Sequence, residues 1–236
     1  MREIIAISFA LPTESSGFIA RLRDKKETSC GDTKVIHGKR SNQSLAVLHT
    51  GVGPKSCERK LDSFFQIERP AYLISSGFAG AVCEDLQVGD LFLAENFSDQ
   101  QLLSGAQRIM PGQRAHKAKL FTSPSIIDSI VERNQIARAT GASAVDMETE
   151  TIAKACARRG IPMLSLRAIS DTPGKPLPVP PNVLFDIEGQ RTDVGKLLSY
   201  LLMHPGSVWR LIAFSRQIAQ ARHALSDAIV DLLRRL

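Results

Sequence analysis

Residues 71–80, AYLISSGFAG, join a short apolar run to a glycine-rich end, and they decide the fold class. A continuous apolar segment such as residues 71–75 is typical of a strand buried on both faces. Such a strand needs helices on both sides, so we expect a sheet covered by helices. Gly77 and Gly80 allow backbone N–H groups to approach a ligand closely, although a tight turn after the strand is the simpler interpretation.

The flanking sequence alternates further β-rich runs with helical stretches, which is the pattern of an α/β protein. The expected strands are 3–9, 45–49, 88–94 and 162–169, and the expected helices are about 55–67, 123–136 and 146–159. The polar stretch 98–119, with its central Pro-Gly, is expected to be a long irregular loop or flap.

A proline-rich segment from residue 173 to residue 181 separates this pattern from a helical end. Proline removes a backbone donor and biases the preceding residue away from helix, so the segment is expected to be an extended connector. Helices are expected over 193–203 and 207–235. Apolar residues of the second helix recur at spacings of three and four, which indicates packing onto the core of the chain or, as an alternative, a coiled coil. We therefore predict one α/β domain over 1–175 and a connector with C-terminal helices over 176–236.

Composition excludes several classes of protein. The chain has 236 residues, of which 43% are hydrophobic and 23% charged, close to the average for soluble globular proteins. No run approaches the roughly 18 apolar residues of a spanning helix, and the start resembles a strand rather than a signal peptide. A cytoplasmic location without stable membrane insertion is expected.

Metal and cofactor motifs are not found in the sequence. The cysteines at 30, 57, 83 and 156 form no C-x-x-C pair. Gly51-Val52-Gly53 follows a strand, but Ser56 occupies the position of the third glycine in a dinucleotide fingerprint. No metal and no cofactor are expected.

The net charge is +6, and much of it lies in the C-terminal helices. Arg210, Arg216 and Arg222 point about 120° apart around a helix at 100° per residue, so they form no basic stripe. A solvated surface explains this charge better than nucleic-acid binding.

Three carboxylates follow or adjoin predicted strands. Glu14 follows the first strand, Glu148 opens the helix over 146–159 with Asp146, and Asp171 follows the strand 162–169. Side chains at strand ends of such a sheet can converge on a ligand. Each also has a structural explanation: a surface position near a helix start for Glu14, the helix dipole for Asp146 and Glu148, and a turn cap for Asp171.

The strings SSGFAG (75–80), AVDMETE (144–150) and RAISDT (167–172) together resemble the purine nucleoside phosphorylase/nucleosidase superfamily. Within it, the chain is most similar to the methylthioadenosine/S-adenosylhomocysteine nucleosidase-type branch, over roughly residues 3–172. The resemblance implies a mixed-sheet α/β fold and cleavage of the N-glycosidic bond of a purine nucleoside. It also implies a homo-oligomer, for which we expect a dimer.

The resemblance also assigns roles to residues. By match to I-S-D, Asp171 is the general acid that protonates the purine N7, and Ser170 positions it. By match to D-M-E, Glu148 holds the ribose hydroxyls and Met147 packs against the sugar. By match to the acid after the first strand, Glu14 orients the attacking water. By match to the glycine loop, the residues that line the nucleoside site are Phe78, Ala79 and Gly80.

The chemistry calls for the same residue types. Cleavage passes through an oxocarbenium-like sugar, so the leaving base needs a proton and the sugar cation needs a negative neighbour. We expect burial to keep Asp171 neutral as the acid, with Glu148 and Glu14 ionised. The family commonly supplies an aromatic side chain that stacks on the base. The sequence leaves three candidates for it: Phe97, Phe121 and Phe185.

The nucleophile decides between hydrolysis and phosphorolysis. Phosphate needs arginine, lysine or a nest of N–H groups, and no basic residue occurs in 8–17 or between Ala71 and Phe97. This favours water, although Arg114, Lys117 or a second subunit could supply the charge. The alternatives are phosphorolysis, hydrolysis of an adenosylated hopanoid lipid, and a non-catalytic nucleoside-binding or membrane-associated module that uses the helix over 207–235.

Overall fold

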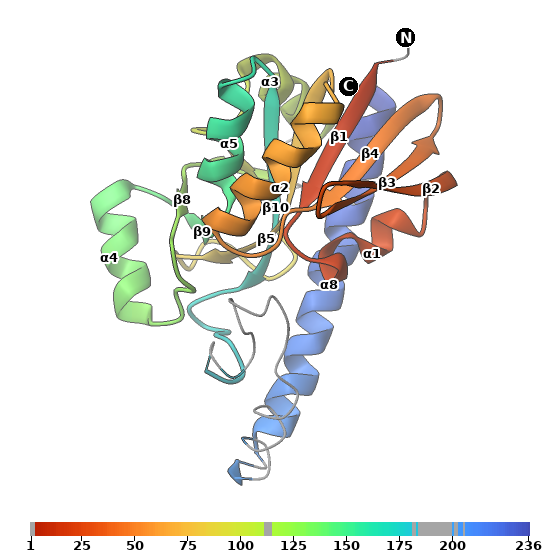
Figure 1. Cartoon of the computed structure of the whole chain (residues 1–236). Coiled ribbons are helices and arrows are strands. Elements are labelled where there is room, and N and C mark those ends of the chain that lie inside the picture. Colours follow the sequence, from red (N-terminus) through yellow and green to blue (C-terminus); the bar gives the residue numbers. More distant parts are fainter. Residues whose placement is uncertain (1–2, 111–114, 181–182, 184–199, 201–202, 205) are drawn as a thin grey trace.

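A mixed ten-stranded sheet forms the centre of the computed structural model, which describes residues 3–110, 115–180, 183, 200, 203–204 and 206–236. The strand order is β2-β3-β4-β1-β5-β10-β6-β7, and β9 joins β5 to β8 (Figure 1). The strands are β1 (Ile4–Phe9), β2 (Arg23–Cys30), β3 (Thr33–Arg40), β4 (Gln43–His49), β5 (Tyr72–Ala81), β6 (Leu91–Ala94), β7 (Ala115–Ala118), β8 (Leu120–Thr122), β9 (Ala144–Asp146) and β10 (Met163–Asp171).

Four parallel strands, β4, β1, β5 and β10, form the middle of the sheet. All nine residues of β10 are buried, as expected for a strand covered on both faces. Parallel pairing brings the carboxyl ends of β1, β5 and β10 to one edge, and it places Asp171 opposite Gly80. Ligands of open α/β sheets bind at this edge.

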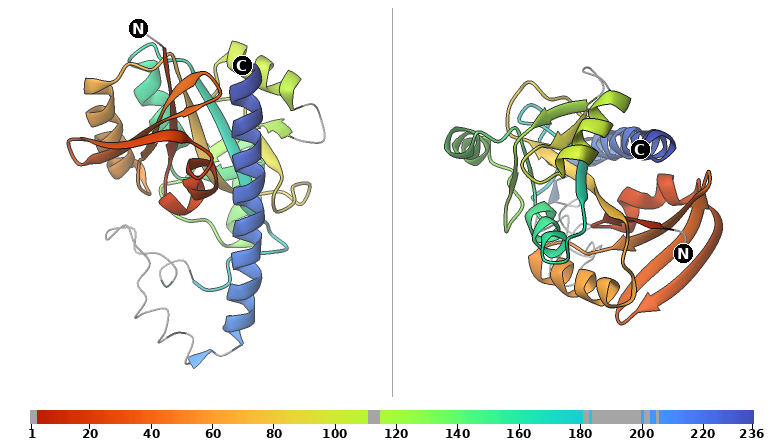
Figure 2. Two further views of the ribbon diagram at one scale, coloured as in Figure 1. Left: turned by 90° about the vertical axis from the view of Figure 1, so that its right-hand side faces the viewer. Right: turned by 90° about the horizontal axis from the view of Figure 1, so that it is seen from above.

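Helices cover both faces of the sheet (Figures 1 and 2). α1 (Pro12–Ile19), α3 (Gln100–Ile109) and α8 (Ser207–Arg235) pack on one face, and α2 (Pro54–Ile67) and α5 (Thr149–Ala157) pack on the other. α4 (Ile130–Thr140) lies to one side of these layers. The α/β fold with a central mixed sheet and a C-terminal helix is confirmed.

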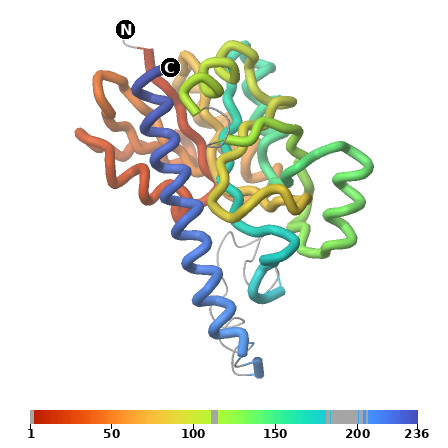
Figure 3. Tube along the Cα trace, turned by 180° about the vertical axis from the view of Figure 1, so that it is seen from behind, coloured from red at the N-terminus to blue at the C-terminus, as the bar shows by residue number. Residues whose placement is uncertain are grey.

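α8 follows the predicted helix 207–235 residue for residue. Leu225, Ile229 and Leu232 in its C-terminal half are buried in the same core as β1 and β10. The N-terminal half extends past the sheet layer, as Figures 2 and 3 show. The expected helix over 193–203 falls largely outside the described residues, and the division of the chain at residue 175 stays a prediction.

The expected loop over 98–119 is wrong. Residues Gln100–Ile109 form α3, and residues Ala115–Ala118 form β7. Asp99 caps α3 by accepting the amide N–H groups of Gln101 and Leu102, and Leu103 and Ala106 face the core. The cap and this apolar spacing outweigh the polar composition of the stretch.

Several other features differ from expectation. The helix expected over 123–136 is α4, which begins at Ile130. The helix expected over 146–159 is two elements, β9 and α5, because Asp146 belongs to a strand. Glu14 lies in the first turn of α1 and is buried, so the alternative of a surface position near a helix start is wrong. The hairpin β2–β3 was not expected at all.

Across the part of the chain that the structure describes, no helix is both long enough and apolar enough to pass through a membrane. The same residues contain no group of three or more His, Cys, Asp or Glu side chains arranged to hold a metal ion.

Candidate active site

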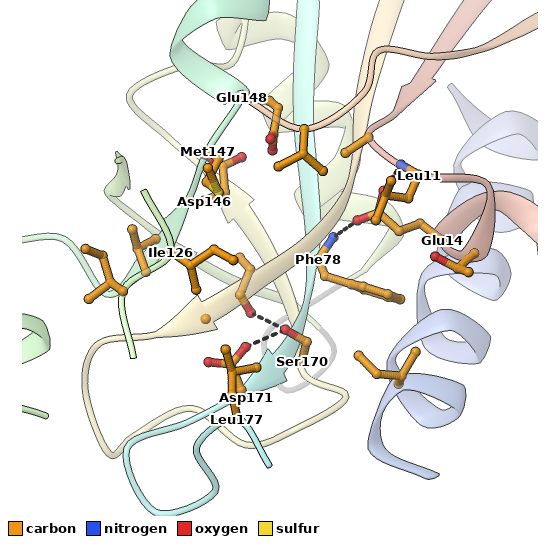
Figure 4. A pocket seen from close by; sticks show the side chains of 18 of the residues that line it. Leu11, Glu14, Phe78, Ile126, Asp146, Met147, Glu148, Ser170, Asp171 and Leu177 are labelled. Carbon is orange, nitrogen blue, oxygen red and sulfur yellow. Dashed lines mark hydrogen bonds between the residues drawn. The ribbon is translucent and has the colours of Figure 1, made fainter. Parts of the chain in front are cut away.

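A cavity of about 370 Å³ lies at the carboxyl ends of β1, β5 and β10. All eight residues assigned from the sequence line it: Glu14, Phe78, Ala79, Gly80, Met147, Glu148, Ser170 and Asp171. They come from α1, β5, the turn before α5 and the end of β10. Figure 4 labels most of them around one hollow: Glu14, Phe78, Met147, Glu148, Ser170 and Asp171. The fold thus brings together residues that are far apart in the sequence.

Glu14 is buried at the junction of α1 and β5. Its Oε1 accepts the Phe78 amide N–H at 3.0 Å, and its Oε2 accepts the Leu11 N–H at 2.9 Å. Burial raises the pKa of the Glu14 carboxyl, and these two hydrogen bonds oppose the rise without cancelling it. A carboxyl group that is fixed by two amides and has a raised pKa is suited to accept a proton from water.

Glu148 lies directly before α5 and accepts the Gly53 amide N–H at 2.8 Å. Gly53 has a φ of 86°, a left-handed conformation that favours glycine. Gly53, the second glycine after β4, therefore holds this carboxyl group. Burial, followed by the nearby charge of Asp146, raises the pKa of Glu148 to about 8.

We expect Glu148→Gln to make the stability of the protein less dependent on pH. A carboxyl group whose pKa rises on folding stabilises the folded state at acidic pH, and this stabilisation is lost as pH rises through the folded pKa. Relative to wild type, the Gln variant should gain at least about 1 kcal/mol of unfolding free energy between pH 5 and pH 9. Urea denaturation across this range measures the difference.

The matched control for this substitution is Glu150→Gln, since Glu150 lies two residues away and is half exposed in an ion pair with Lys154. Its stability difference from wild type should stay constant with pH. A constant difference for Glu148→Gln as well would contradict the raised pKa of Glu148.

Asp171 has both carboxylate oxygens engaged. The Ser170 hydroxyl donates to Oδ1 at 2.6 Å, and Nη2 of Arg133 pairs with Oδ2. Arg133 is 1% exposed, so little water screens this charge pair. The guanidinium and the Ser170 hydroxyl thus hold the carboxyl group from two sides.

The glycines of β5 make room for the carboxylates. A Cβ atom on Gly77 would lie 3.0 Å from Oε1 of Glu14, and one on Gly80 would lie 2.9 Å from Oδ2 of Asp171. The sequence suggested a tight turn after the strand at these glycines or, as the alternative, backbone N–H groups exposed to a ligand. The turn is wrong, because β5 continues through both glycines to Ala81. In the structure, the N–H of Phe78 is used by Glu14 instead.

A second buried ion pair lies beneath the cavity. Arg167 of β10 donates from Nε to Oδ2 of Asp146 at 2.9 Å, and its Nη2 donates to the hydroxyls of Ser75 and Thr149. Asp146 also accepts the Thr149 N–H near the start of α5. Both acids of the D-M-E string line the cavity, but their contacts differ: Asp146 links three elements, and Glu148 accepts the Gly53 N–H.

The expected charges were a neutral Asp171 and ionised Glu14 and Glu148. The pKa of Glu148 is raised to about 8 and that of Glu14 is raised as well, mainly by burial, so the ionised form of Glu148 is disfavoured near neutral pH. The charge of Asp171 stays a prediction. Asp171 pairs with Arg133, which the sequence reasoning did not single out. It also missed the segment Ser125 to Ile127 and the α8 residues Phe214 and Ile218, which line the cavity.

Comparisons with known proteins agree with the fold and the motifs. The model of the phosphorylase superfamily matches residues 4–110 and 97–202 of the chain. The 5′-methylthioadenosine/S-adenosylhomocysteine nucleosidase of Haemophilus influenzae (strain PittGG) is 26% identical over 178 residues, 64% of this chain and 78% of that protein. The nucleosidase of the same name from Staphylococcus haemolyticus is 25% identical over 197 residues, 71% of this chain and 86% of its own.

Solved structures share the fold at lower identity. S-adenosylhomocysteine nucleosidase from Streptococcus pyogenes, in complex with 5-methylthiotubericidin, has a TM-score of 0.76 at 19% identity and covers 100% of this chain and 98% of its own. Futalosine hydrolase of Helicobacter pylori also has a TM-score of 0.76, at 17% identity, with 99% of this chain and 98% of its own covered. The family model spans most of the chain and includes every residue of the cavity's three motifs, so this protein belongs to the phosphorylase superfamily.

Proposed function

We propose that this protein hydrolyses the N-glycosidic bond of a purine nucleoside, a 5′-modified adenosine. The observation that carries the proposal is the convergence of Glu14, Glu148 and Asp171 on one cavity, each held by a different set of partners. The nucleosidase names of the relatives at about 25% identity support the same reaction.

The proposed reaction assigns one task to each carboxyl group. Asp171, positioned by Ser170, donates a proton to N7 of the purine, and the electrons of the broken C–N bond leave with the base. Glu14 takes a proton from the water whose oxygen bonds to the sugar carbon. Glu148 binds the ribose hydroxyls beside Met147. The products are the free base and the sugar, and water supplies all of their added atoms.

The lining of the cavity favours water over phosphate as the nucleophile. Its described residues include no lysine, arginine or histidine. Arg133 and Arg167 lie behind the wall and are engaged by Asp171 and Asp146. Lys117 lies on β7 near Glu95, away from the lining residues, and Arg114 is outside the described part of the chain. A phosphate ion would therefore find no free cation on the described walls.

The remaining wall favours an apolar 5′ substituent. Leu177, Phe214 and Ile218 line the cavity beyond the residues assigned to the base and the ribose. Further out on the same helix, Trp209 is 76% exposed and Ile212 is 39% exposed. This observation favours an alkylthio-type group over the free hydroxyl of adenosine, and it also favours the second candidate substrate, an adenosylated hopanoid lipid.

Base release with and without phosphate tests the proposal. Adenosine, 5′-methylthioadenosine and 5′-alkylthioadenosines of increasing chain length are incubated with the protein, and free adenine is measured. We expect equal release with and without phosphate, and kcat/KM that rises from adenosine to the alkylthio substrates, by about 10-fold or more if the apolar wall covers the alkyl group.

Two other results would contradict this proposal. Release that requires phosphate and yields ribose-1-phosphate would identify a phosphorylase. Binding of these nucleosides without base release would identify a non-catalytic binding module.

A further inference from the structure

Arg133 stands out in α4, where every residue from Ile130 to Thr140 is described and Arg133 alone is buried. A helix that rests on its neighbours by one side chain normally uses an apolar one. Burial of a guanidinium is unfavourable unless its charge and its N–H groups are matched. The groups that Arg133 contacts should therefore account for its burial.

The guanidinium of Arg133 meets three oxygens. Nη2 pairs with Oδ2 of Asp171 and donates to the Ile127 carbonyl at 3.0 Å, and Nη1 donates to the Ala81 carbonyl. Nε has no hydrogen-bond partner among the described residues. An apolar side chain would fill this space without an unmatched donor, so packing alone does not account for the arginine.

Arg133 is not among the residues that line the cavity, so it acts on a bound nucleoside only through Asp171. The Ser170 hydroxyl holds the other carboxylate oxygen at 2.6 Å, which leaves the carboxyl group fixed from two sides. Gly80 lies against the pair, since a Cβ atom there would be 2.9 Å from Asp171 Oδ2 and 3.2 Å from Arg133 Nη1. The pair is therefore built into the wall next to the cavity.

We propose that Arg133 is a positioning residue that stabilises the carboxylate formed on Asp171 when its proton passes to the purine N7. This inference rests on the proposed function. In that step the O–H bond of Asp171 breaks, its electron pair stays on the carboxylate, and an N–H bond forms at N7. Negative charge appears on Asp171 only as the proton leaves, and a cation that is already in place stabilises that charge in the transition state.

Two substrates separate this role from a structural one. A 5′-alkylthioadenosine needs a proton at N7, whereas its N7-methylated analogue already carries a cationic base and leaves without one. For Arg133→Met we expect kcat to fall about 10²-fold with the first substrate and less than about threefold with the second, with KM changed less than about threefold for both. Arg133→Lys, which keeps a charge, should lie between wild type and Arg133→Met.

The double variant Arg133→Met/Asp171→Asn provides a second readout, because two residues that serve one step are not additive. Its kcat should match that of Asp171→Asn within about threefold. The matched control is Arg138→Met, an exposed arginine in the last turn of the same helix, which should behave as wild type. Thermal unfolding shows whether each variant is folded. If Arg133→Met does not fold, Arg133→Lys and the double variant still test the proposal.

The possible outcomes are distinguishable. Equal loss of kcat with both substrates, or no loss with either, overturns this inference and leaves the proposed function standing. A wild-type protein that releases no base from any of the adenosine derivatives overturns the proposed function, and this inference with it.

Discussion

Asp171→Asn is expected to lower kcat for base release from a 5′-modified adenosine by about 10²–10⁴-fold, the range for loss of a general acid. Asparagine keeps the shape of the side chain and can still donate a hydrogen bond to N7, but it cannot transfer a proton. KM should change little, because the walls that bind the ribose and the 5′ group are untouched. Steady-state adenine release and binding of a non-hydrolysable analogue measure the two quantities separately.

This substitution also leaves Arg133 without its counter-charge, so part of any loss could reflect a weakened fold. Thermal unfolding of the variant answers that point. Asp227→Asn is the matched control, because Asp227 is paired with Arg21 in a largely exposed ion pair on α8. It should retain full activity. Wild-type kcat in a folded Asp171→Asn protein would contradict the role of Asp171.

The motif residues that line the cavity could be predicted from the sequence, because each motif lies at a strand end and resembles one of a known family. The runs AYLIS and PMLSLRAI are typical of buried parallel strands, and parallel strands end at one edge. Glu14 and Asp171 line one cavity for that reason, whereas Glu148 reaches the same cavity from just after β9, which pairs with β5 in the antiparallel sense. The helical spacing of Phe214, Ile218 and Leu225 was also informative, because one apolar stripe of α8 both lines the cavity and packs on the core.

Two strands at the edge of the sheet escaped prediction for a physical reason. β2, with the sequence RDKKETSC, exposes most of its residues and buries Cys30, so it has no alternating apolar pattern. Its strand conformation comes from pairing with β3 and from the turn at Gly31, which has a φ of 60°. Pairing between segments is not visible in the composition of either one.

The raised pKa values of the two glutamates and the pairing of Asp171 with Arg133 could not be predicted, because they depend on neighbours that are distant in the sequence. Arg133 lies in a polar run, VERNQIAR, where nothing marks it as buried. It is 38 residues from Asp171 along the chain. The pKa of Glu148 is likewise set by burial and by Asp146, whose own charge is balanced by Arg167 from another strand. A motif identifies a carboxyl group, and the fold supplies the neighbours that surround it.

Arg167→Met is expected to destabilise the protein by about 3–5 kcal/mol, the usual result of removing one partner of a buried ion pair. Arg167 is 2% exposed, and it links Asp146 to the hydroxyls of Ser75 and Thr149. Methionine fills much of the same volume, so the loss comes from the charge of Asp146, which stays buried without a cation. Urea denaturation of both proteins measures the difference in unfolding free energy.

Two further variants show whether the unpaired charge is the cause. Arg167→Met/Asp146→Leu removes both charges and should recover part of the lost stability, because a buried pair contributes little net stability over apolar residues of similar volume. Lys154→Met breaks an exposed pair with Glu150 and should change the unfolding free energy by less than about 0.5 kcal/mol. If Arg167→Met were as mild as Lys154→Met, water would be reaching Asp146, and the charge of Asp146 would contribute less to the raised pKa of Glu148. Exclusion of water thus has two effects here. It makes the loss of Arg167 costly to stability, and it raises the pKa of Glu148, the residue proposed to bind the ribose.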